Sequence, residues 1–407
     1  MYLNDVRIGE MDLPFFFLVI VLLVFGLVIM YSASYAWGIH DGKGPYYYFI
    51  RQSQMAGIGL VIMMFLASPL FDYHIMKNPL ITYGTFLASL VLMVLVFTSL
   101  GTSSSEADRW ITIGSIQFQP SELVKLTMVM VFAYMMSANY KNMRTVKYGI
   151  MPYLMVMGVI LALTMAQRHL SATIIIACIG LSLIFVGGAR LDHFIVLVLL
   201  MLVIGGAGFY LLYSIGKFDY VMVRIEGWLD PFAKENRDLA WQTRNSLIAI
   251  GSGGVFGLGL GNSRQKFLYL PESKNDFVFA IVCEELGFIG ASLVIILFLV
   301  LIFRGFAIAQ NSPDKYGMLL ATGIMVQVGL QALLNIAVVT NSIPNTGISL
   351  PFFSYGGTAL ILQLAEMGVV LNISRQSIPH KGKDDTPMDD KELAEIHKAK
   401  QQLRKGE

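Results

Sequence analysis

The sequence predicts an all-α polytopic membrane protein with about ten transmembrane helices. Of its 407 residues, 56% are hydrophobic and 14% are charged, whereas roughly 25% of the residues in an average soluble domain are charged. The mean hydropathy is +0.65. A helix that crosses a bilayer needs ~20 predominantly apolar residues, and stretches of this kind recur along the chain. The composition therefore argues against a soluble domain, and the net charge of +2 gives no indication of a nucleic-acid partner.

Ten apolar stretches have about the length of a membrane span. They lie at roughly 14–34, 54–71, 79–99, 121–138, 149–166, 171–188, 193–214, 276–303, 316–340 and 355–374. The fifth and sixth are separated only by Gln167, Arg168 and His169. Residues 1–13 lack the basic region and small-residue cleavage site of a signal peptide, so we expect the first stretch to remain as a helix.

Lysine and arginine residues in the short loops predict the orientation, because cytoplasmic loops are enriched in them. The loops assigned to the cytoplasm carry Lys77, Lys141, Arg144, Lys147, Arg190, Arg304 and Lys315. We therefore expect residues 1–13 to be a cytoplasmic N-terminus, 14–376 the transmembrane domain and 377–407 a polar cytoplasmic tail. A large extracellular loop is expected at about 215–275, between spans 7 and 8. Its aromatic residues suggest pieces at the membrane interface, and we interpret 101–120 in the same way.

Asp276 is the sharpest candidate for chemistry. It lies at the start of the eighth span, after the helix-breaking Pro271. A carboxylate at the membrane surface could act as a general base or position the headgroup of a lipid-linked substrate. The alternative is a helix cap, because Asp and Asn are favoured at the N-cap position and near the positive end of a helix.

Other charged residues lie deeper in the predicted spans. Glu284 lies about 12 Å deeper than Asp276 on the same helix, and Glu285 points nearly opposite to Asp276. One glutamate could face a polar cavity, and the alternative for both is structural pairing with Lys or Arg. Glu122 and Lys125 are three residues apart and can pair on one helix face. Lys125 could instead bind a pyrophosphate.

Several cations outside the spans could bind an anionic lipid headgroup, although a solvated surface role is the alternative for most of them. They are Arg109, Arg224, Arg244, Arg264 and Lys266. No metal site is predicted, because His169 is isolated and the two cysteines, Cys178 and Cys283, show no ligand spacing.

Two segments rich in glycine or proline flank the spans. The glycines from Gly251 to Gly261 match neither a phosphate-binding loop nor a dinucleotide fingerprint, so we interpret them as sites of sharp turns or close backbone approach. The segment 342–358 contains two prolines and three glycines, which indicate a broken or re-entrant stretch that lines a cavity. Polar residues of the last two spans form either interhelical hydrogen bonds or a pathway: Gln327, Gln331, Asn335 and Glu366.

Five motifs, taken together, resemble the SEDS family of bacterial membrane proteins, which includes FtsW, RodA and SpoVE. They are Phe118-Gln-Pro-Ser-Glu-Leu-Val-Lys125, Gly251-Ser-Gly-Gly, Leu270-Pro-Glu with Asp276-Phe-Val-Phe-Ala, Glu284-Glu-Leu-Gly and Pro351-Phe-Phe-Ser-Tyr-Gly-Gly. The resemblance covers about residues 11–376. The run Ile343-Pro-Asn-Thr-Gly is more similar to FtsW or SpoVE than to RodA.

The resemblance implies a peptidoglycan glycosyltransferase. It would polymerise lipid II into β-1,4 glycan strands at the outer face of the bacterial cytoplasmic membrane, in cell division or sporulation. The family's essential aspartate corresponds to Asp276, which would activate or align the acceptor hydroxyl. Arg109, Lys125 and Arg224 would stabilise the pyrophosphate leaving group. Further substrate-binding residues are expected at Glu122, Gln242, Ser246, Ser252, Lys266, Glu272, Glu284 and Ser354.

The resemblance also implies partners. These are the lipid II substrate, a class B penicillin-binding protein that acts as transpeptidase, and other membrane proteins of division or sporulation. A divalent cation, Mg²⁺ or Mn²⁺, could bridge the pyrophosphate, although the sequence shows no ligand cluster. The family's acid and proline after the fifth span are missing from the stretch between Gln167 and Thr173, so no role is transferred to His169. Asn245 replaces a family glutamine.

Two other functions compete with the polymerase. A lipid II flippase would need a hydrophilic path through the bilayer, for which Lys125, Glu284, Glu285 and Glu366 are candidates. A non-enzymatic scaffold of the division machinery would depend on its surface loops and would tolerate the substitution Asp276→Ala. The position of Asp276 at the outer surface favours the polymerase.

Overall fold

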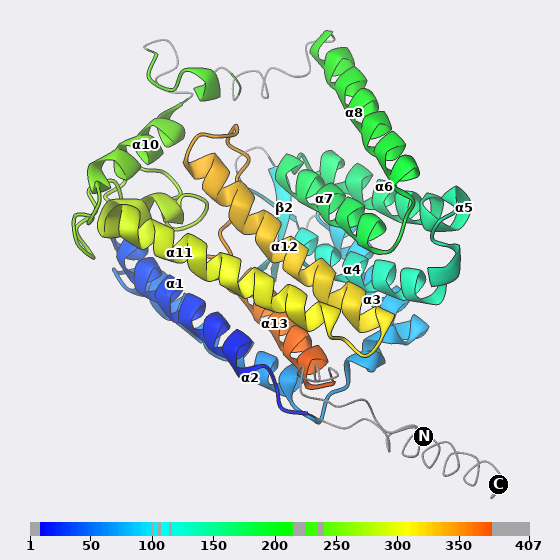
Figure 1. The fold of residues 1–407 in the computed structure, drawn as a ribbon. Coiled ribbons are helices and arrows are strands. Elements are labelled where there is room, and N and C mark those ends of the chain that lie inside the picture. The colour runs from blue at the N-terminus through cyan, green and yellow to red at the C-terminus, as the bar shows by residue number, and fades with distance from the viewer. Residues whose placement is uncertain are drawn as a thin grey trace, which may run out of the picture.

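The computed structural model describes residues 9–98, 101–104, 107–113, 116–214, 225, 227–233 and 240–376. Within this part the chain forms a bundle of long helices (Figure 1). The predicted polar tail, 377–407, and much of the predicted extracellular loop lie outside the described residues.

The long helices follow the predicted spans. They are α1 (Leu13–His40), α2 (Tyr47–Ala67), α3 (Pro79–Leu95), α4 (Pro120–Ala138), α6 (Met151–Ala166), α7 (Leu170–Val186), α8 (Leu191–Ser214), α11 (Val278–Gln310), α12 (Lys315–Val339) and α13 (Gly357–Gln376), with α5 (Val146–Gly149) and α10 (Trp241–Gly253) between them. Seven helices of the described part are long and apolar enough to cross a membrane, and three shorter apolar stretches coincide with other predicted spans. The protein is therefore a multi-span membrane protein, while the count of ten spans and the cytoplasmic location of the termini stay predictions.

The segment 101–118, expected to be a piece at the membrane interface, forms strands in a structure that is otherwise mostly helical in its described part. It forms a three-stranded antiparallel sheet of β1 (Gly101–Ser104), β2 (Ala107–Ile113) and β3 (Ile116–Phe118), in the order β1-β2-β3. Ile111 pairs with Phe118 in the register between β2 and β3. The isoleucines and threonines of this stretch favour a strand, because β-branched side chains pack well on a pleated surface.

α2 begins at Tyr47, well before the predicted start near residue 54. Its first turns contain Arg51 and Gln52, and these polar residues exclude the turns from a span predicted as a run of apolar residues. Gln52 is 1% exposed, and its Nε2 donates a hydrogen bond to Ser354 O at 3.0 Å. A partner far away in the sequence therefore allows a polar side chain inside the helix bundle.

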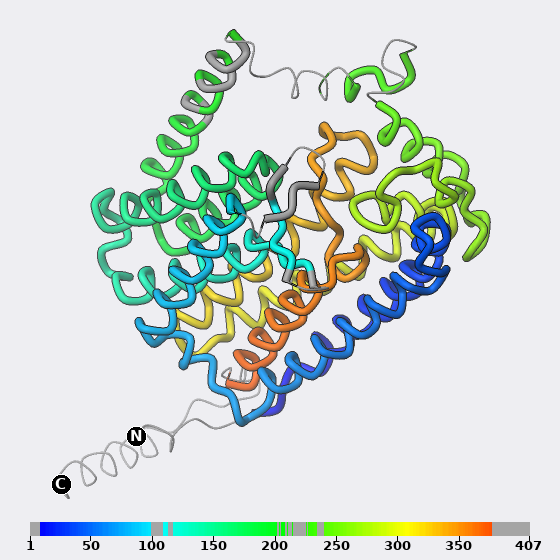
Figure 2. Tube along the Cα trace, turned by 180° about the vertical axis from the view of Figure 1, so that it is seen from behind, coloured from blue at the N-terminus to red at the C-terminus, as the bar shows by residue number. Residues whose placement is uncertain are grey.

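Small residues bring α2 and α13 together, and the two helices lie side by side in Figure 2. A Cβ on Gly59 of α2 would lie 2.6 Å from Leu364 Cδ1, and a Cβ on Gly368 of α13 would lie 2.7 Å from Met63 O. Close backbone approach at glycine is a common basis of helix packing in membranes. Neither position would accept alanine without movement of its neighbour.

Hydrogen bonds between distant segments close one end of the bundle, which we call the Arg375 end. Gly9 N donates to Arg375 O at 2.8 Å, and Arg304 Nη2 lies 2.8 Å from the Asp12 carboxylate. The loops predicted to be cytoplasmic lie at this end. Asp276 lies at the opposite end of the bundle, which we call the Asp276 end, where α11 begins.

α11 is interrupted at Gly287, whose φ of 65° and ψ of −165° are not helical. The N–H groups of residues 258–259 donate to the carbonyls of residues 284–285 at 3.0 and 2.9 Å. After the break, the N–H groups of residues 288–289 donate to the carbonyls of residues 254–255 at 2.9 and 3.2 Å. The glycine-rich loop thus replaces helical hydrogen bonds that the break removes.

Glycine is required where this loop meets α11. A Cβ on Gly287 would lie 2.3 Å from Gly257 N, and a Cβ on Gly253 would lie 2.0 Å from Cys283 O. The interpretation of the glycine run as a site of close backbone approach is confirmed. Residues 342–356 are likewise irregular and partly buried, with Phe353 at 0% exposure, as expected for a broken segment.

Candidate active site

Asp276 lies in the turn that leads into α11. Residues 271–277 form this turn, and α11 begins at Val278 with Phe277 as its N-cap residue. Asp276 thus lies one residue before the N-cap position and is not itself the N-cap residue. The residue is partly exposed at the end of the bundle.

Asn335 of α12 fixes the main chain of this turn. Its Nδ2 donates hydrogen bonds to Asp276 O at 2.7 Å and to Ile348 O at 2.6 Å. Asn335 is 0% exposed. Of the two roles that the sequence left open for it, the structure shows a hydrogen-bonding one, and the bonds go to the main chain of two loops.

The segment that follows α12 holds the same turn from another side. Ser354 Oγ donates to Asn275 O at 2.7 Å and accepts from Leu350 N at 2.7 Å. Tyr355 N donates to Lys274 O at 2.8 Å. The hydroxyl of Ser354, a predicted substrate-binding residue, is therefore engaged in positioning the turn.

A glycine leaves room beside the carboxylate. Gly347 has a φ of +70°, and a Cβ at this position would lie 3.2 Å from Asp276 Oδ2. Asn345 Oδ1 accepts from Gly347 N at 3.0 Å, and Asn345 Nδ2 donates to Gln242 Oε1 at 2.8 Å. The structure thus brings the predicted residue Gln242, on α10, to the loop that faces Asp276.

Lys274 is a cation beside the Asp276 turn that the sequence did not predict to be functional. Its Nζ lies 4.3 Å from the ring centroid of Trp37, 4.0 Å from that of Tyr48 and 3.9 Å from Asp41 Oδ2. Burial lowers the pKa of Lys274. Its partners belong to α1, α2 and the turn between them, so the only signal in the sequence was its place within the motif that contains Asp276.

Lys266, Glu284 and Glu285 form a separate buried network. Lys266 Nζ lies 3.0 Å from Glu285 Oε1, and the two side chains are 4% and 0% exposed. Glu284 accepts from Ser263 Oγ at 2.5 Å and from Arg264 N at 2.9 Å. These contacts favour the structural alternative for both glutamates, and they also correct the expectation that Lys266 is an external cation, because its charge is buried against the loop.

Glu122 and Lys125 of α4 pair as the spacing predicts. Lys125 Nζ lies 2.8 Å from Glu122 Oε1, and Lys125 is 1% exposed. Arg109 lies on β2, and its Nη2 donates to Arg168 O at 2.9 Å. Burial and the positive charges of Arg109 and Lys125 lower the pKa of His169 to about 3. His169 is therefore neutral at physiological pH.

The structure does not gather all the predicted substrate-binding residues around Asp276. Ser246 is 0% exposed and donates to the main chain of α12. Ser252 is exposed near the end of α10, and Glu272 accepts a hydrogen bond from Asn275. Arg224 lies outside the described residues, so its role stays a prediction.

The described residues contain no group of three or more His, Cys, Asp or Glu side chains that could hold a metal ion. A divalent cation bound by protein groups alone does not fit this part of the chain. We therefore derive no step of the reaction through a bound metal, and a requirement for Mg²⁺ or Mn²⁺ stays a prediction.

Comparison with known proteins identifies the family. The chain matches the model of the FtsW/RodA/SpoVE family, described as cell cycle proteins, over residues 13–378. The chain belongs to this family. It is 39% identical over 369 residues to the stage V sporulation protein E of Bacillus subtilis (strain 168). The aligned region covers 90% of this chain and 97% of that protein. The family expected from the sequence motifs is thus confirmed.

Other members of the FtsW/RodA/SpoVE family are similar over nearly their whole length. The probable peptidoglycan glycosyltransferase FtsW of Geobacter sp. (strain M18) is 35% identical over 90% of this chain and 98% of its own. A chain from a peptidoglycan synthase complex that coordinates polymerization and crosslinking has a TM-score of 0.73 at 26% identity, over 90% of this chain and 98% of that one. The rod shape determining protein RodA of Thermus thermophilus has a TM-score of 0.64 at 26% identity, over 90% and 97%.

Proposed function

We propose that this protein is a peptidoglycan glycosyltransferase that polymerises lipid II in cell division or sporulation. The observation that carries the proposal is the Asp276 carboxylate, which sits in a turn held by Asn335 and faces the open position at Gly347. Membership of a family that includes probable peptidoglycan glycosyltransferases supports it. The protein would act at the outer face of the bacterial cytoplasmic membrane.

Asp276 would act on the acceptor. Its carboxylate accepts the proton of the acceptor 4-hydroxyl as that oxygen attacks the anomeric carbon of the donor, and the bond from this carbon to the pyrophosphate breaks. Undecaprenyl pyrophosphate leaves with the electron pair. Fixing the main chain through Asn335 holds the carboxylate in place, and a preorganised group adds no reorganisation cost at the moment of reaction.

The flippase alternative receives no support from the charges proposed for a transport path. Lys125 and Glu366 are each 1% exposed and hydrogen-bonded to Glu122 and Gln327, respectively. Glu284 and Glu285 are 1% and 0% exposed and engaged by the loop 263–266. Charges paired within the protein do not offer a hydrophilic path.

We also infer that the protein works with a transpeptidase. One structurally similar chain comes from a complex that coordinates polymerization and crosslinking, and a class B penicillin-binding protein is the partner that fits this description. Other division or sporulation membrane proteins are expected as further partners. Copurification of the tagged protein with its cognate transpeptidase tests this proposal, and separate elution in several mild detergents would contradict it.

The decisive experiment measures glycan polymerisation from purified lipid II, with and without the transpeptidase. Wild type should form long glycan, and Asp276→Ala and Asp276→Asn should be slower by at least about 100-fold. The matched control is Asp192→Asn, an exposed aspartate at the Arg375 end that pairs with Arg190. Equal product from wild type and Asp276→Ala would remove Asp276 from the mechanism. No product from wild type with its partner would favour the flippase or the scaffold.

The same assay tests the metal requirement. Chelation with EDTA followed by addition of Mg²⁺ or Mn²⁺ should lower and then restore the rate if a cation bridges the pyrophosphate. An unchanged rate after chelation would remove the cation from the proposal without affecting the role of Asp276.

A further inference from the structure

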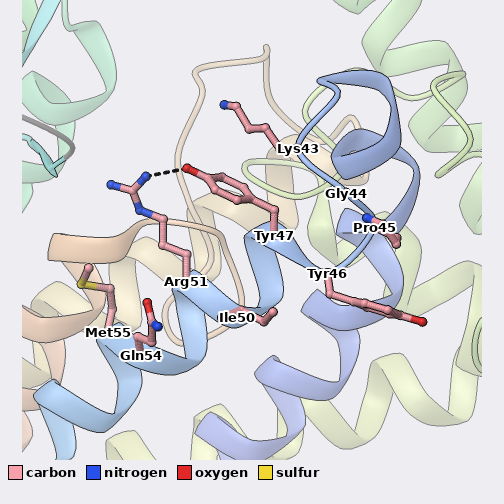
Figure 3. A pocket seen from close by; sticks show the side chains of 9 residues that line it. All are labelled: Lys43, Gly44, Pro45, Tyr46, Tyr47, Ile50, Arg51, Gln54 and Met55. Atoms are coloured by element: carbon pink, nitrogen blue, oxygen red, sulfur yellow. Dashed lines mark hydrogen bonds between the residues drawn. The ribbon is translucent and has the colours of Figure 1, made fainter.

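A cavity of about 630 Å³ opens at the Asp276 end, between the α1–α2 turn and the first turns of α2. Its wall consists of residues 43–47 and of side chains on one face of α2, among them Ile50, Arg51 and Met55 (Figure 3). None of these residues was predicted to bind substrate. The cavity is therefore separate from the residues assigned above to the reaction.

Two cations project into the same region of this cavity. Arg51 Nη1 donates a hydrogen bond to Tyr47 OH at 2.9 Å, and Lys43 Nζ lies 5.1 Å from the centroid of the Tyr47 ring. Figure 3 shows both side chains extending toward the hydroxyl end of Tyr47. A guanidinium group, an ammonium group and a phenol hydroxyl in this arrangement suit a phosphate group, which accepts charge-assisted hydrogen bonds.

The neighbouring acids do not cancel these charges. Asp41 accepts a hydrogen bond from Tyr48 OH and lies 3.9 Å from Lys274 Nζ. Lys43, Arg51 and Lys274 outnumber Asp41 and Glu272, the carboxylates whose charges act on Lys274. This excess of positive charge favours the binding of an anion.

The wall of the cavity continues into an apolar surface. Ile50 is 52% exposed in the cavity wall, and Ile58, Val61 and Phe65 are 49%, 71% and 55% exposed further along α2. At about 100° per residue these four side chains fall on one side of the helix. A hydrocarbon chain attached to a phosphate in the cavity could lie along this stripe, so the surface fits a lipid better than a free phosphate ion.

The cavity also borders the Asp276 turn. Lys43 Nζ lies 5.7 Å from the centroid of the Tyr48 ring, and Lys274 Nζ lies 4.0 Å from the same centroid. Lys274 precedes Asp276 by two residues. A headgroup bound by Lys43 and Arg51 would thus lie beside the turn that carries the proposed catalytic carboxylate.

We propose that this cavity binds the phosphate-bearing headgroup of a membrane lipid, with Lys43 and Arg51 as its cations and the lipid chain along α2. If the ligand is a polyprenyl pyrophosphate, the cavity holds one of the lipid-linked substrates; this reading rests on the proposed function. If it is a phospholipid, the cavity anchors the bilayer next to the Asp276 turn. The shared chemistry is a phosphate on a hydrocarbon chain.

The test measures direct binding to the full chain in detergent. The probes are undecaprenyl pyrophosphate and dioleoylphosphatidylglycerol, titrated separately, and native mass spectrometry counts the bound lipid. Lys43→Gln/Arg51→Gln should weaken binding of at least one probe tenfold or more. The control Lys141→Gln/Arg144→Gln removes the same charge from exposed positions at the Arg375 end and should change the affinity less than twofold.

The two probes show whether the cavity binds a lipid-linked substrate or a phospholipid of the bilayer. A loss confined to undecaprenyl pyrophosphate assigns the cavity to the substrate, and a loss confined to phosphatidylglycerol assigns it to the bilayer. Unchanged affinity of the double variant for both probes, with a melting temperature equal to that of wild type, overturns the proposal. If the double variant unfolds, the single variants Arg51→Lys and Tyr47→Phe replace it, because each retains the charge and the approximate size of the side chain while changing the geometry. If each of these variants binds the two probes with wild-type affinity, the proposal is again overturned.

The experiments distinguish a failure of the lipid-binding proposal from a failure of the proposed glycosyltransferase function. Asp276→Ala should bind both probes with wild-type affinity, since the cavity lies outside the reacting groups. Binding without polymerisation by wild type would leave the cavity assigned and the glycosyltransferase rejected. Polymerisation by wild type, together with unchanged lipid binding by Lys43→Gln/Arg51→Gln, would support the glycosyltransferase and reject the lipid site in the cavity.

Discussion

Asn335 donates hydrogen bonds from one amide nitrogen to the carbonyls of Asp276, at 2.7 Å, and Ile348, at 2.6 Å. One buried side chain thus joins the turn before α11 to the irregular segment after α12. The same segment contains Gly347, whose missing side chain leaves space at the Asp276 carboxylate. The position of Asp276 therefore depends on contacts between three parts of the chain.

Removing the amide of Asn335 should lower the rate of polymerisation more than it weakens substrate binding. Asn335→Ala leaves two buried carbonyls without their donor, which costs about 1–3 kcal/mol for each group. We expect kcat to fall at least about tenfold with KM nearly unchanged, measured with purified lipid II. Gln331→Ala, one turn earlier on α12 and 2% exposed, is the control. Equal effects of the two substitutions would mean that Asn335 has no special role in positioning Asp276.

Alanine at Gly287 should destabilise the protein severely. The new Cβ would lie 2.3 Å from Gly257 N at a φ of +65°, and both the strain and the overlap must be relieved by moving the loop. We expect a loss of about 3 kcal/mol or more, measured as a large drop in melting temperature in detergent. Gly251→Ala is the control, because nothing lies within 4 Å of its Cβ; it should be neutral or stabilising by up to about 1 kcal/mol. A tolerated Gly287→Ala would contradict the close packing of loop and helix.

The Lys266–Glu285 pair should act as a structural unit. Glu285→Gln leaves a buried ammonium unpaired and should cost about 3–5 kcal/mol, while the double variant Lys266→Met/Glu285→Leu should cost less than the two single losses combined. Thermal unfolding of the four proteins measures this coupling. The exposed pair Arg190–Asp192 should show a coupling of only about 0–1 kcal/mol.

The double variant also tests the original expectation for Lys266. If the Lys266 ammonium only stabilises the loop, the folded double variant Lys266→Met/Glu285→Leu should polymerise lipid II at close to the wild-type rate. A rate that falls at least about tenfold in a protein with wild-type melting behaviour would restore Lys266 as a substrate-binding residue.

Stability should depend on pH through His74 at the Arg375 end. His74 Nε2 lies 3.7 Å from Asp314 Oδ2 and His74 Nδ1 lies 2.7 Å from Asp72 Oδ1, and the carboxylates of Asp314 and Asp72 raise the pKa of His74. The folded state therefore binds this proton more tightly, so the contribution is complete below the unfolded pKa of about 6.5 and is lost as the pH rises through the raised pKa. Between about pH 6 and pH 8 wild type should lose on the order of 0.5 kcal/mol more stability than His74→Asn, a small value because the pair is partly exposed.

Melting temperatures at several pH values measure this difference. The exposed His40 supplies the control, and His40→Asn should keep the pH dependence of wild type. If the melting temperature of His74→Asn changed with pH as steeply as that of wild type, another group would be responsible for the pH dependence of stability.

Much of the architecture follows from the sequence because apolar length is a local property. The stretch that became α12 needs no partner to be recognised, since its residues are apolar over the thickness of a bilayer. α2 shows the limit of this reasoning: Arg51 and Gln52 fall inside the helix, but the buried hydrogen bond from Gln52 to Ser354 joins residues that lie far apart in the sequence. The small sheet at 101–118 was missed for a related reason, because the aromatic and polar residues of that stretch also fit an interfacial segment.

The sequence by itself determined the membrane class, the approximate positions of the helices, the Glu122–Lys125 pair and the choice of Asp276, since length, spacing and motif are written along the chain. Tertiary structure alone decided which charges are buried. Lys266 and Glu284, expected at a binding site, are enclosed with Glu285 and the loop 263–266, whereas Lys274 borders the Asp276 turn through rings of α1 and α2. The physical reason is that the cost of a charge inside a membrane protein depends on its partners, and these partners come from segments that only folding brings together.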